Sequence, residues 1–179
     1  MKFKTILLIF FLLFSSTSFA LTQGYLYILN DKCILELYDE AINHFNSTEI
    51  SVIKDTRGII LRTEINSPAN NINKLSSELY KKALIIEDFL AKIQKSAIIE
   101  VHVTEQGRKD GLPLNNWELS TIIANNIESV VLESRKRIEI SKISSVGYGE
   151  FLPAKNTSNN GGKCSNRVDI ILPCSISGE

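Results

Sequence analysis

The sequence has few of the residues on which most catalytic and metal sites depend. Its 179 residues include two histidines, His44 and His102, and three cysteines, Cys33, Cys164 and Cys174. The histidines show no metal-ligand spacing with the cysteines, and no Cys-x-x-Cys motif occurs. A glycine-rich phosphate loop and a Ser/His/Asp or Cys/His order are missing as well. We therefore expect a protein that is not an enzyme and that uses no metal and no cofactor.

The sequence also lacks a block of positive charge and a long hydrophobic run. Twenty basic residues balance 20 acidic ones, and no basic cluster of the kind that binds nucleic acid occurs. Nucleic acid is thus excluded as a partner. The apolar run from Ile6 to Phe14 is far shorter than the roughly 20 residues of a membrane-spanning helix.

The short apolar run has the features of a signal peptide. Lys2 and Lys4 precede it, and Ser18-Phe19-Ala20 supplies small residues at the cleavage position. We interpret residues 1–20 as a signal peptide; a retained anchor is the alternative. Cleavage leaves Leu21 first, which argues against a lipid-modified cysteine, and we expect no membrane-spanning segment in the mature chain.

Export would carry the cysteines into a compartment where thiols oxidise. Ten residues separate Cys164 from Cys174, so we predict a disulfide between these two, with Cys33 unpaired. Three buried free thiols are the alternative.

Hydrophobic periodicity divides the mature chain into an extension (residues 21–47), a domain (48–174) and a short tail (175–179). In the extension, apolar residues at three- and four-residue steps predict a helix from Asp31 to Phe45. This helix is either a tether or docking element, or it packs on the domain's own sheet. The β-branched runs Ile50–Ile53 and Ile59–Ile65 predict a hairpin around a turn that Gly58 closes.

The rest of the domain alternates between helical and strand patterns. Ser67-Pro68 predicts the start of a long helix of about seven turns that ends at Ile93. A strand from Ala97 to Val103, a helix capped by Asn115 or Asn116, and two further strands in "KISSVGYGEFLP" and "RVDIILP" follow. This order predicts an α+β fold, a two-layer α/β sandwich with helices packed on a mixed sheet.

Four segments, in this order, resemble the motifs of the OmpA-like peptidoglycan-binding domain, in the variety found in flagellar stator proteins of the MotB type. They are "IIEVHVTE", "NNWELSTIIANNIESVV", "KISSVGYGEFLP" and "NRVDIIL". The resemblance covers roughly Glu49 to Pro173 and implies a βαβαβ domain with a mixed sheet. It also implies a non-catalytic module, outside the inner membrane, that binds the diaminopimelate side of the cell-wall peptide stem.

The resemblance implies where such a ligand binds. A carboxylate after the second strand pairs with the ammonium group of the ligand. An arginine in the next helix forms a bidentate pair with the ligand's carboxylate, and backbone groups at the helix N-terminus complete the pocket. The matching positions, taken as candidate ligand-binding residues, are Thr104, Glu105, Asn116, Leu119, Ser120, Ile123, Asn166 and Arg167.

The sequence departs from the family at the arginine, because Ile123 occupies that position. Loss of one partner of a buried charge pair costs about 2–5 kcal/mol, which weakens binding by about 30-fold to several thousand-fold. The candidate replacements for this arginine are Arg167, or Arg108 and Lys109 in the loop between Glu105 and the helix. The alternative for Arg108 and Lys109 is that they are surface charges without a binding role. Glu105 is either a ligand carboxylate or a solvated one.

Two hypotheses follow for the function. The first is an exported domain that lies in the periplasm or cell envelope, or is associated with the outer membrane. In this hypothesis it binds weakly to the peptide stem of peptidoglycan. The alternative is a structural module of an envelope or secretion assembly that binds a protein and has lost peptidoglycan. We interpret Trp117 as a packing residue rather than a stacking platform, and Tyr148 as the marker of a tight glycine turn.

Overall fold

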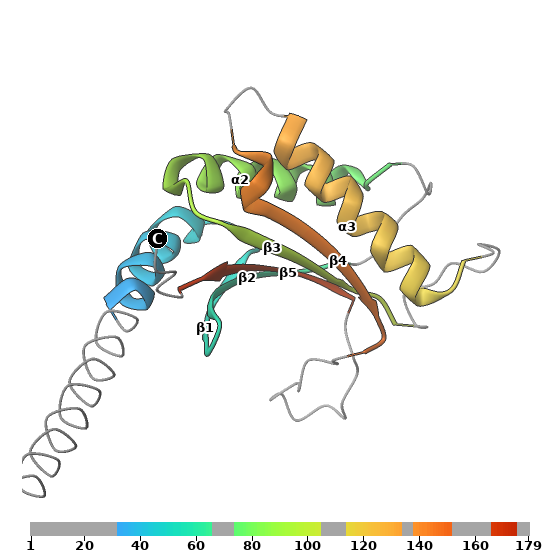
Figure 1. Ribbon diagram of the computed structural model, residues 1–179, viewed down its shortest axis with the longest axis horizontal. Helices are drawn as coiled ribbons and strands as arrows, with labels where there is room; N and C mark the ends of the chain where they lie inside the picture. Colours follow the sequence, from blue (N-terminus) through green and yellow to red (C-terminus); the bar gives the residue numbers. More distant parts are fainter. Residues whose placement is uncertain (1–31, 66–73, 105–113, 134–137, 152–165, 175–179) are drawn as a thin grey trace, which may run out of the picture.

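A five-stranded sheet with helices on one face forms the domain (Figure 1). The structure is a computed structural model, and it describes residues 32–65, 74–104, 114–133, 138–151 and 166–174. The strand order is β1-β2-β5-β3-β4, with β3 and β4 parallel and the other neighbours antiparallel. The strands are β1 (Ser51–Asp55), β2 (Gly58–Glu64), β3 (Ala97–His102), β4 (Ile143–Gly149) and β5 (Arg167–Pro173). The predicted α+β sandwich with a mixed sheet is confirmed.

Helices α2 (Ser77–Ile93) and α3 (Asn116–Glu133) cover the same face of the sheet (Figure 1). Two parallel neighbouring strands require a crossover connection, and α3 supplies it between β3 and β4. A short 3-10 helix, η2 (Ile140–Lys142), leads into β4. Each helix within the described ranges is too short or too polar to span a bilayer.

The predicted hairpin is confirmed as β1 and β2, which pair from Ser51↔Arg62 to Asp55↔Gly58. Asp55 stabilises the turn, because its Oδ1 accepts a hydrogen bond from the backbone N–H of Arg57 (3.1 Å). Gly58 has a φ of +138°, and a Cβ there would lie 2.1 Å from the carbonyl oxygen of Leu172. Glycine is therefore required for β5 to pack this closely.

Helix α2 is shorter than the sequence predicted. Ser76 caps it, because its Oγ accepts a hydrogen bond from the backbone N–H of Leu79 (3.2 Å). The predicted start at Ser67 lies outside the described residues, but residues 74–76 are not helical, so a single helix from Ser67 to Ile93 is wrong. The predicted end at Ile93 is confirmed, and Gln94 follows it in the left-handed conformation with a φ of 53°.

Helix α3 begins with a reciprocal cap. The Oδ1 of Asn115 accepts a hydrogen bond from the backbone N–H of Glu118 (2.8 Å), and Glu118 Oε2 accepts one from the backbone N–H of Asn115 (2.9 Å). This is a capping box with asparagine in the cap position. The predicted cap is confirmed at Asn115.

We expect Asn115→Ala to lower the free energy of unfolding by about 1 kcal/mol, because the backbone N–H of Glu118 at the helix end loses its partner. Asn115→Asp is the matched control and should keep the wild-type value, since aspartate caps as well as asparagine. Urea denaturation measures both. An equal loss in the two variants would contradict a capping role.

The helix of residues 32–45 packs against the domain rather than standing apart as a tether. Leu37, Ala41 and Phe45 are buried in the same core as the sheet and α2. The rings of Phe45 and Phe89 of α2 meet edge to face with centroids 5.0 Å apart. The interpretation of this helix as packed on its own domain is confirmed.

A disulfide joins this helix to the far end of β5. Cys33 and Cys174 form a disulfide, with Cα atoms 5.9 Å apart and a sequence separation of 141. The predicted Cys164–Cys174 disulfide is therefore wrong; Cys164 lies outside the described residues. The prediction relied on closeness in sequence, but β5 is extended over Arg167–Pro173, which carries Cys174 about 20 Å away from the start of that strand.

Candidate functional site

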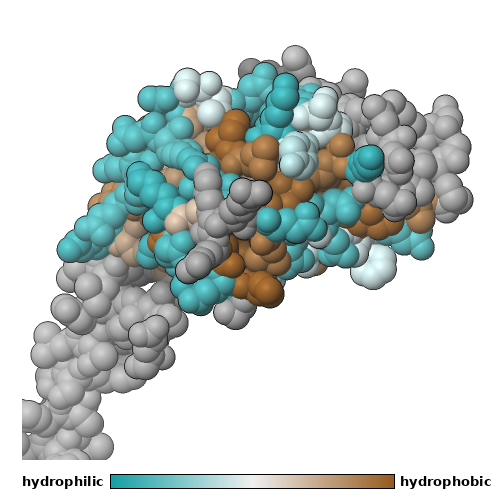
Figure 2. Space-filling view, turned by 90° about the horizontal axis from the view of Figure 1, so that it is seen from above, coloured by the Kyte–Doolittle hydropathy of each residue, from teal (hydrophilic) through white to brown (hydrophobic). Residues whose placement is uncertain are grey.

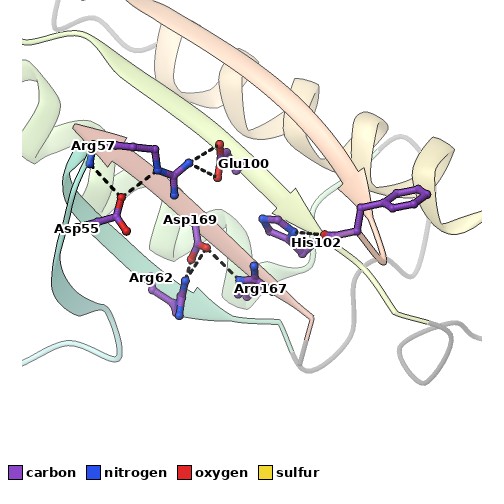
Figure 3. A network of polar contacts seen from close by, with 8 residues as sticks. Asp55, Arg57, Arg62, Glu100, His102, Arg167 and Asp169 are labelled. Carbon is purple, nitrogen blue, oxygen red and sulfur yellow. Dashed lines mark hydrogen bonds and ion pairs between the residues drawn. The ribbon is translucent and has the colours of Figure 1, made fainter. Parts of the chain in front are cut away.

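The face of the sheet opposite α2 and α3, here called the open face, carries charged residues in register. Arg62 of β2, Asp169 of β5 and Glu100 of β3 are direct cross-strand neighbours, and Arg167 pairs with His102 in the next row. Alternation along each strand places these side chains on one face and the core aliphatics on the other. The buried charge network, as we call it, consists of Arg57, Arg62, Glu100, His102, Arg167 and Asp169 (Figure 3).

Asp169 is the centre of the network. It is 2% exposed. Arg62 donates to both of its carboxylate oxygens, through Nε (2.6 Å) and Nη2 (2.8 Å), and Arg167 donates through Nε (3.0 Å). Burial alone would raise the pKa of Asp169, but the hydrogen bonds from Arg62 and Arg167 outweigh it, and the pKa lies below its ordinary value. The charge is thus fixed by two guanidiniums.

Glu100 receives its partner from the hairpin turn. Arg57 reaches across β5, and its Nη1 donates to Glu100 at 3.0 and 3.3 Å (Figure 3). Burial raises the pKa of Glu100 above its ordinary value, and Arg57 offsets only part of this rise. Arg57 is itself half exposed, so this ion pair forms the edge of the network toward solvent.

His102 is held in place on both sides. Its Nδ1 is 3.1 Å from the carbonyl oxygen of Phe151 (Figure 3), and its ring stacks on Tyr148, with centroids 5.2 Å apart and planes 8° from parallel. The pairing of β3 with β4 is interrupted by a bulge, because Val101 pairs with Gly147 and His102 pairs with Gly149. Tyr148 is therefore the unpaired residue of β4, and its ring lies with His102 on the open face. Burial, followed by the charge of Arg167, lowers the pKa of His102. The imidazole is therefore neutral at neutral pH.

A second polar group, here called the polar end cluster, gathers where β3 and β4 end, beside the start of α3. It consists of Thr104, Asn116, Ser120 and Asn166, four of the residues that the family resemblance predicted. Thr104 donates its backbone N–H to Asn166 Oδ1 (2.7 Å). Val103, one residue earlier, donates its backbone N–H to the carbonyl of Gly149 (2.9 Å), which joins β3 to the end of β4.

Gly149 brings the start of α3 onto the same end of the sheet. Ser120 Oγ accepts the backbone N–H of Gly149 (2.8 Å) and donates to the carbonyl of Trp117 (2.9 Å). Gly149 has a φ of +54°, and a Cβ there would lie 3.0 Å from the nitrogen of Trp117, which confirms the predicted glycine turn beside Tyr148. Asn116 Oδ1 is buried and has no hydrogen-bond partner among the described residues.

Other predicted residues lie elsewhere. Ile123 and Leu119 are each 1% exposed and belong to the hydrophobic core between α3 and the sheet. Arg167 faces the open side, where it binds Asp169. Glu105, Arg108 and Lys109 lie outside the described residues. The interpretation of Trp117 as a packing residue is wrong, because it is 59% exposed.

The buried charge network was not predicted as a unit. The only sequence signal for it is the alternation in "IIEVHV" and "RVDIIL", which places Glu100 with His102, and Arg167 with Asp169, on one face of each strand. The register between strands decides which side chains of neighbouring strands lie opposite each other. Register depends on contacts between residues that are distant in sequence, so it cannot be inferred from one strand alone.

Comparison with known proteins yields structures but no relatives in sequence. No family model matches the chain, and no curated protein matches it. A solved MotB-like protein from Desulfovibrio vulgaris superposes with a TM-score of 0.66 at 21% identity, over 84% of this chain and 98% of that one. The cell wall anchor of the type VI secretion system from Pseudomonas aeruginosa gives 0.58 at 17% identity, over 76% and 96%.

The periplasmic domain of Helicobacter pylori MotB also superposes, with a TM-score of 0.54 at 17% identity, over 69% of this chain and 81% of that one. At such low identity these likenesses establish the fold. They agree with the motif order in "IIEVHVTE" through "NRVDIIL", since both point to the same arrangement of strands and helices.

Proposed function

We propose that this chain, which has the OmpA-like fold of MotB-like domains, is an exported envelope protein that associates with peptidoglycan and catalyses no reaction. Two lines support the proposal. The motif series of the peptidoglycan-binding family runs through the chain in order. Among the motif residues, Thr104 is hydrogen-bonded to Asn166 at the end of β3, and Ser120 is hydrogen-bonded to Gly149 at the end of β4.

The observation that carries the proposal is the free acceptor of Asn116. Its Oδ1 is buried beside the N-terminus of α3 with no partner among the described residues. A buried acceptor left unpaired costs about 1–3 kcal/mol, so a ligand that brings an N–H group to this position recovers that cost. The ammonium of diaminopimelate and the amides of the peptide stem are donors of this kind.

We infer that the association is weak. The arginine position of the family is Ile123, whose side chain is in the core, and Arg167 is bonded to Asp169 on the other face of the sheet. Ile123 therefore contributes no cation to the polar end cluster. Loss of an arginine at this position is worth about 2–5 kcal/mol of binding.

Cosedimentation of the purified, oxidised domain with insoluble sacculi at low salt tests this function. We expect a measurable fraction of the wild type in the pellet, and Asn116→Ala should reduce it at least about threefold, because one hydrogen bond is worth roughly 1 kcal/mol. Asn125→Ala is the matched control, since Asn125 is an exposed residue of the same helix; it should pellet as the wild type does.

Absence of the wild type from the pellet would contradict peptidoglycan association. Equal pelleting of wild type and Asn116→Ala would place any binding outside the polar end cluster. Ile123→Arg is not a usable variant, because a charge at a position 1% exposed in the core would unfold the domain.

A protein-binding role is the second candidate, and the outer surface of α2 favours it. Tyr80 and Leu84, one helical turn apart, are 47% and 39% exposed. Figure 2 looks onto the helical side and shows apolar residues among hydrophilic ones there. Photo-crosslinking from position 84 in cells tests this role: a discrete adduct in envelope fractions supports it, and absence of any adduct counts against it.

A further inference from the structure

We propose that β1 pairs with the β1 strand of a second copy of this chain, so that two copies share one continuous sheet around a twofold axis. β1 forms an edge of the sheet, since β2 is its only neighbour among the described strands. An edge strand carries a row of backbone donors and acceptors that can pair with another chain. Strands β2 and β5 separate this edge from β3 and the polar end cluster, so the proposal does not depend on peptidoglycan binding.

The hydrogen-bond pattern shows which residues of β1 face the free edge. Ile65, directly after β2, donates its backbone N–H to the carbonyl of Asn166 (2.8 Å). The odd-numbered residues of β2 are therefore bonded to β5, and the even-numbered ones are bonded to β1, because the bonds alternate along an antiparallel strand. Each even-numbered residue of β2 lies opposite an odd-numbered residue of β1. The backbone N–H and C=O groups of Val52 and Lys54 therefore point away from β2, toward the free edge.

These outward groups limit how two copies of β1 can pair. Antiparallel pairing places outward groups opposite outward groups, and three registers then pair more than half of the strand. Lys54 opposite the partner's Lys54 is excluded, because like charges directly opposite each other repel. Val52 opposite the partner's Val52 brings Glu49 opposite the partner's Asp55, which repels for the same reason. The remaining register places Val52 opposite the partner's Lys54 and pairs the whole strand.

In this register the charges of the two copies are complementary. Ser51 lies opposite the partner's Asp55, and its hydroxyl can donate a hydrogen bond to that carboxylate. Continued past the strand ends, the register places Glu49 opposite the partner's Arg57. These side chains are 79% and 49% exposed. Each has a partner in its own chain, but Glu49 Oε1 and Arg57 Nη2 have none among the described residues. The twofold axis forms each contact twice.

An apolar pair lies at the centre of this interface. Ile53 is opposite the partner's Ile53, and it is only partly buried within one chain. Cross-strand pairs of β-branched residues stabilise a sheet, so this contact covers apolar surface that one copy leaves accessible. Because β1 has five residues, the paired segment is short, and we expect a reversible dimer that forms at high protein concentration.

Disulfide trapping tests the register, in a chain whose Cys164 is serine. Ile53→Cys should form a disulfide between two copies, because the two residues of a non-hydrogen-bonded pair have Cα atoms about 4.5 Å apart. Ser51→Cys is the matched control on the same face of β1. Its counterpart in the second copy is four residues away along the strand, or about 13 Å, so this variant should stay uncrosslinked. No disulfide at position 53, or equal crosslinking at positions 51 and 53, would overturn the proposal.

Sedimentation equilibrium of the purified, oxidised chain tests the charge pairing. We expect Glu49→Lys to weaken the dimer by about tenfold, because the lost ion pair counts twice and a repulsion replaces it. Glu139→Lys is the matched control. Glu139 is also an exposed glutamate with a lysine partner, but it precedes β4, at the opposite edge of the sheet, and its substitution should leave the dissociation constant unchanged. A chain that is monomeric at millimolar concentration, or an equal effect of the two substitutions, would contradict the proposal.

Discussion

Replacement of Cys33 by serine, in a chain whose Cys164 is also serine, is expected to lower the free energy of unfolding by about 2–5 kcal/mol. The Cys33–Cys174 disulfide closes a loop with a sequence separation of 141, which contains the whole domain of residues 48–174. A crosslink of this span removes much of the conformational freedom of the unfolded chain. It also fixes the helix of residues 32–45, whose Phe45 contributes to the core beside Phe89. Urea denaturation under oxidising conditions measures the loss.

Cys164→Ser alone is the matched control, because it leaves the Cys33–Cys174 disulfide intact. It should keep the wild-type stability, and thiol titration of the unreduced, denatured wild type should find one free thiol. Stability equal in the double and single variants, or three free thiols in the wild type, would contradict the disulfide. The double variant also prevents Cys164 from pairing with Cys174 once Cys33 is gone.

Asp169→Asn is the second substitution with a large expected effect, a loss of about 3–5 kcal/mol. The aspartate accepts three hydrogen bonds from two guanidiniums, and Arg167 is 4% exposed. The asparagine amide group would present a donor where Arg62 or Arg167 also donates. A buried guanidinium would then lose the counter-charge that Asp169 supplies, which is far more costly than loss of a neutral hydrogen bond.

Asp55→Asn is the matched control for this substitution. Asp55 also pairs with an arginine, Arg57, but its side chain is 34% exposed, and ion pairs of this kind are worth roughly 0–1 kcal/mol. We expect chemical denaturation to show a loss several times larger at position 169 than at position 55. Comparable losses in the two variants would mean that the network contributes no more than surface charge does.

Local patterns in the sequence predict most of the elements, because their causes are local. The β-branched run from Ile59 to Ile65 and the turn at Gly58 define the hairpin. Asn115 and Glu118 define the start of α3. The start of α2 was predicted wrongly, because the local pattern extends beyond the helix. The apolar stripe continues back to Ile72 and Leu75, so periodicity alone did not reveal that Ser76 caps the helix.

Features that depend on tertiary contacts were not predictable in this way. The partner of Cys174 is Cys33 because a helix near the start of the chain packs beside the end of β5. The buried charge network forms because Arg62, Asp169 and Glu100 fall in one cross-strand row. The spacing of residues within one segment predicts neither the disulfide partner of Cys174 nor the cross-strand partners of the charged residues. A register shift of one residue would turn the charged side chains of that strand into the core.

The candidate site was predictable only as far as the family motifs carry it. They name Thr104, Asn116, Ser120 and Asn166, which lie near the ends of β3, β4 and β5 and the start of α3; that these residues bind a ligand stays a prediction. The same positions do not fix where a side chain points. Arg167 turns to the open face because strand alternation places it with Asp169, and Ile123 turns inward on the apolar side of α3.

An NMR titration of the ¹⁵N-labelled, oxidised domain with soluble muropeptides tests the proposed function most directly. The proposal predicts fast-exchange shifts at the side-chain amide of Asn116 and at the backbone amides of Thr104 and Gly149. We expect a millimolar dissociation constant, because isoleucine occupies the arginine position of the family at residue 123. Unchanged spectra at millimolar ligand, or shifts confined to the outer surface of α2 around Tyr80, would contradict it.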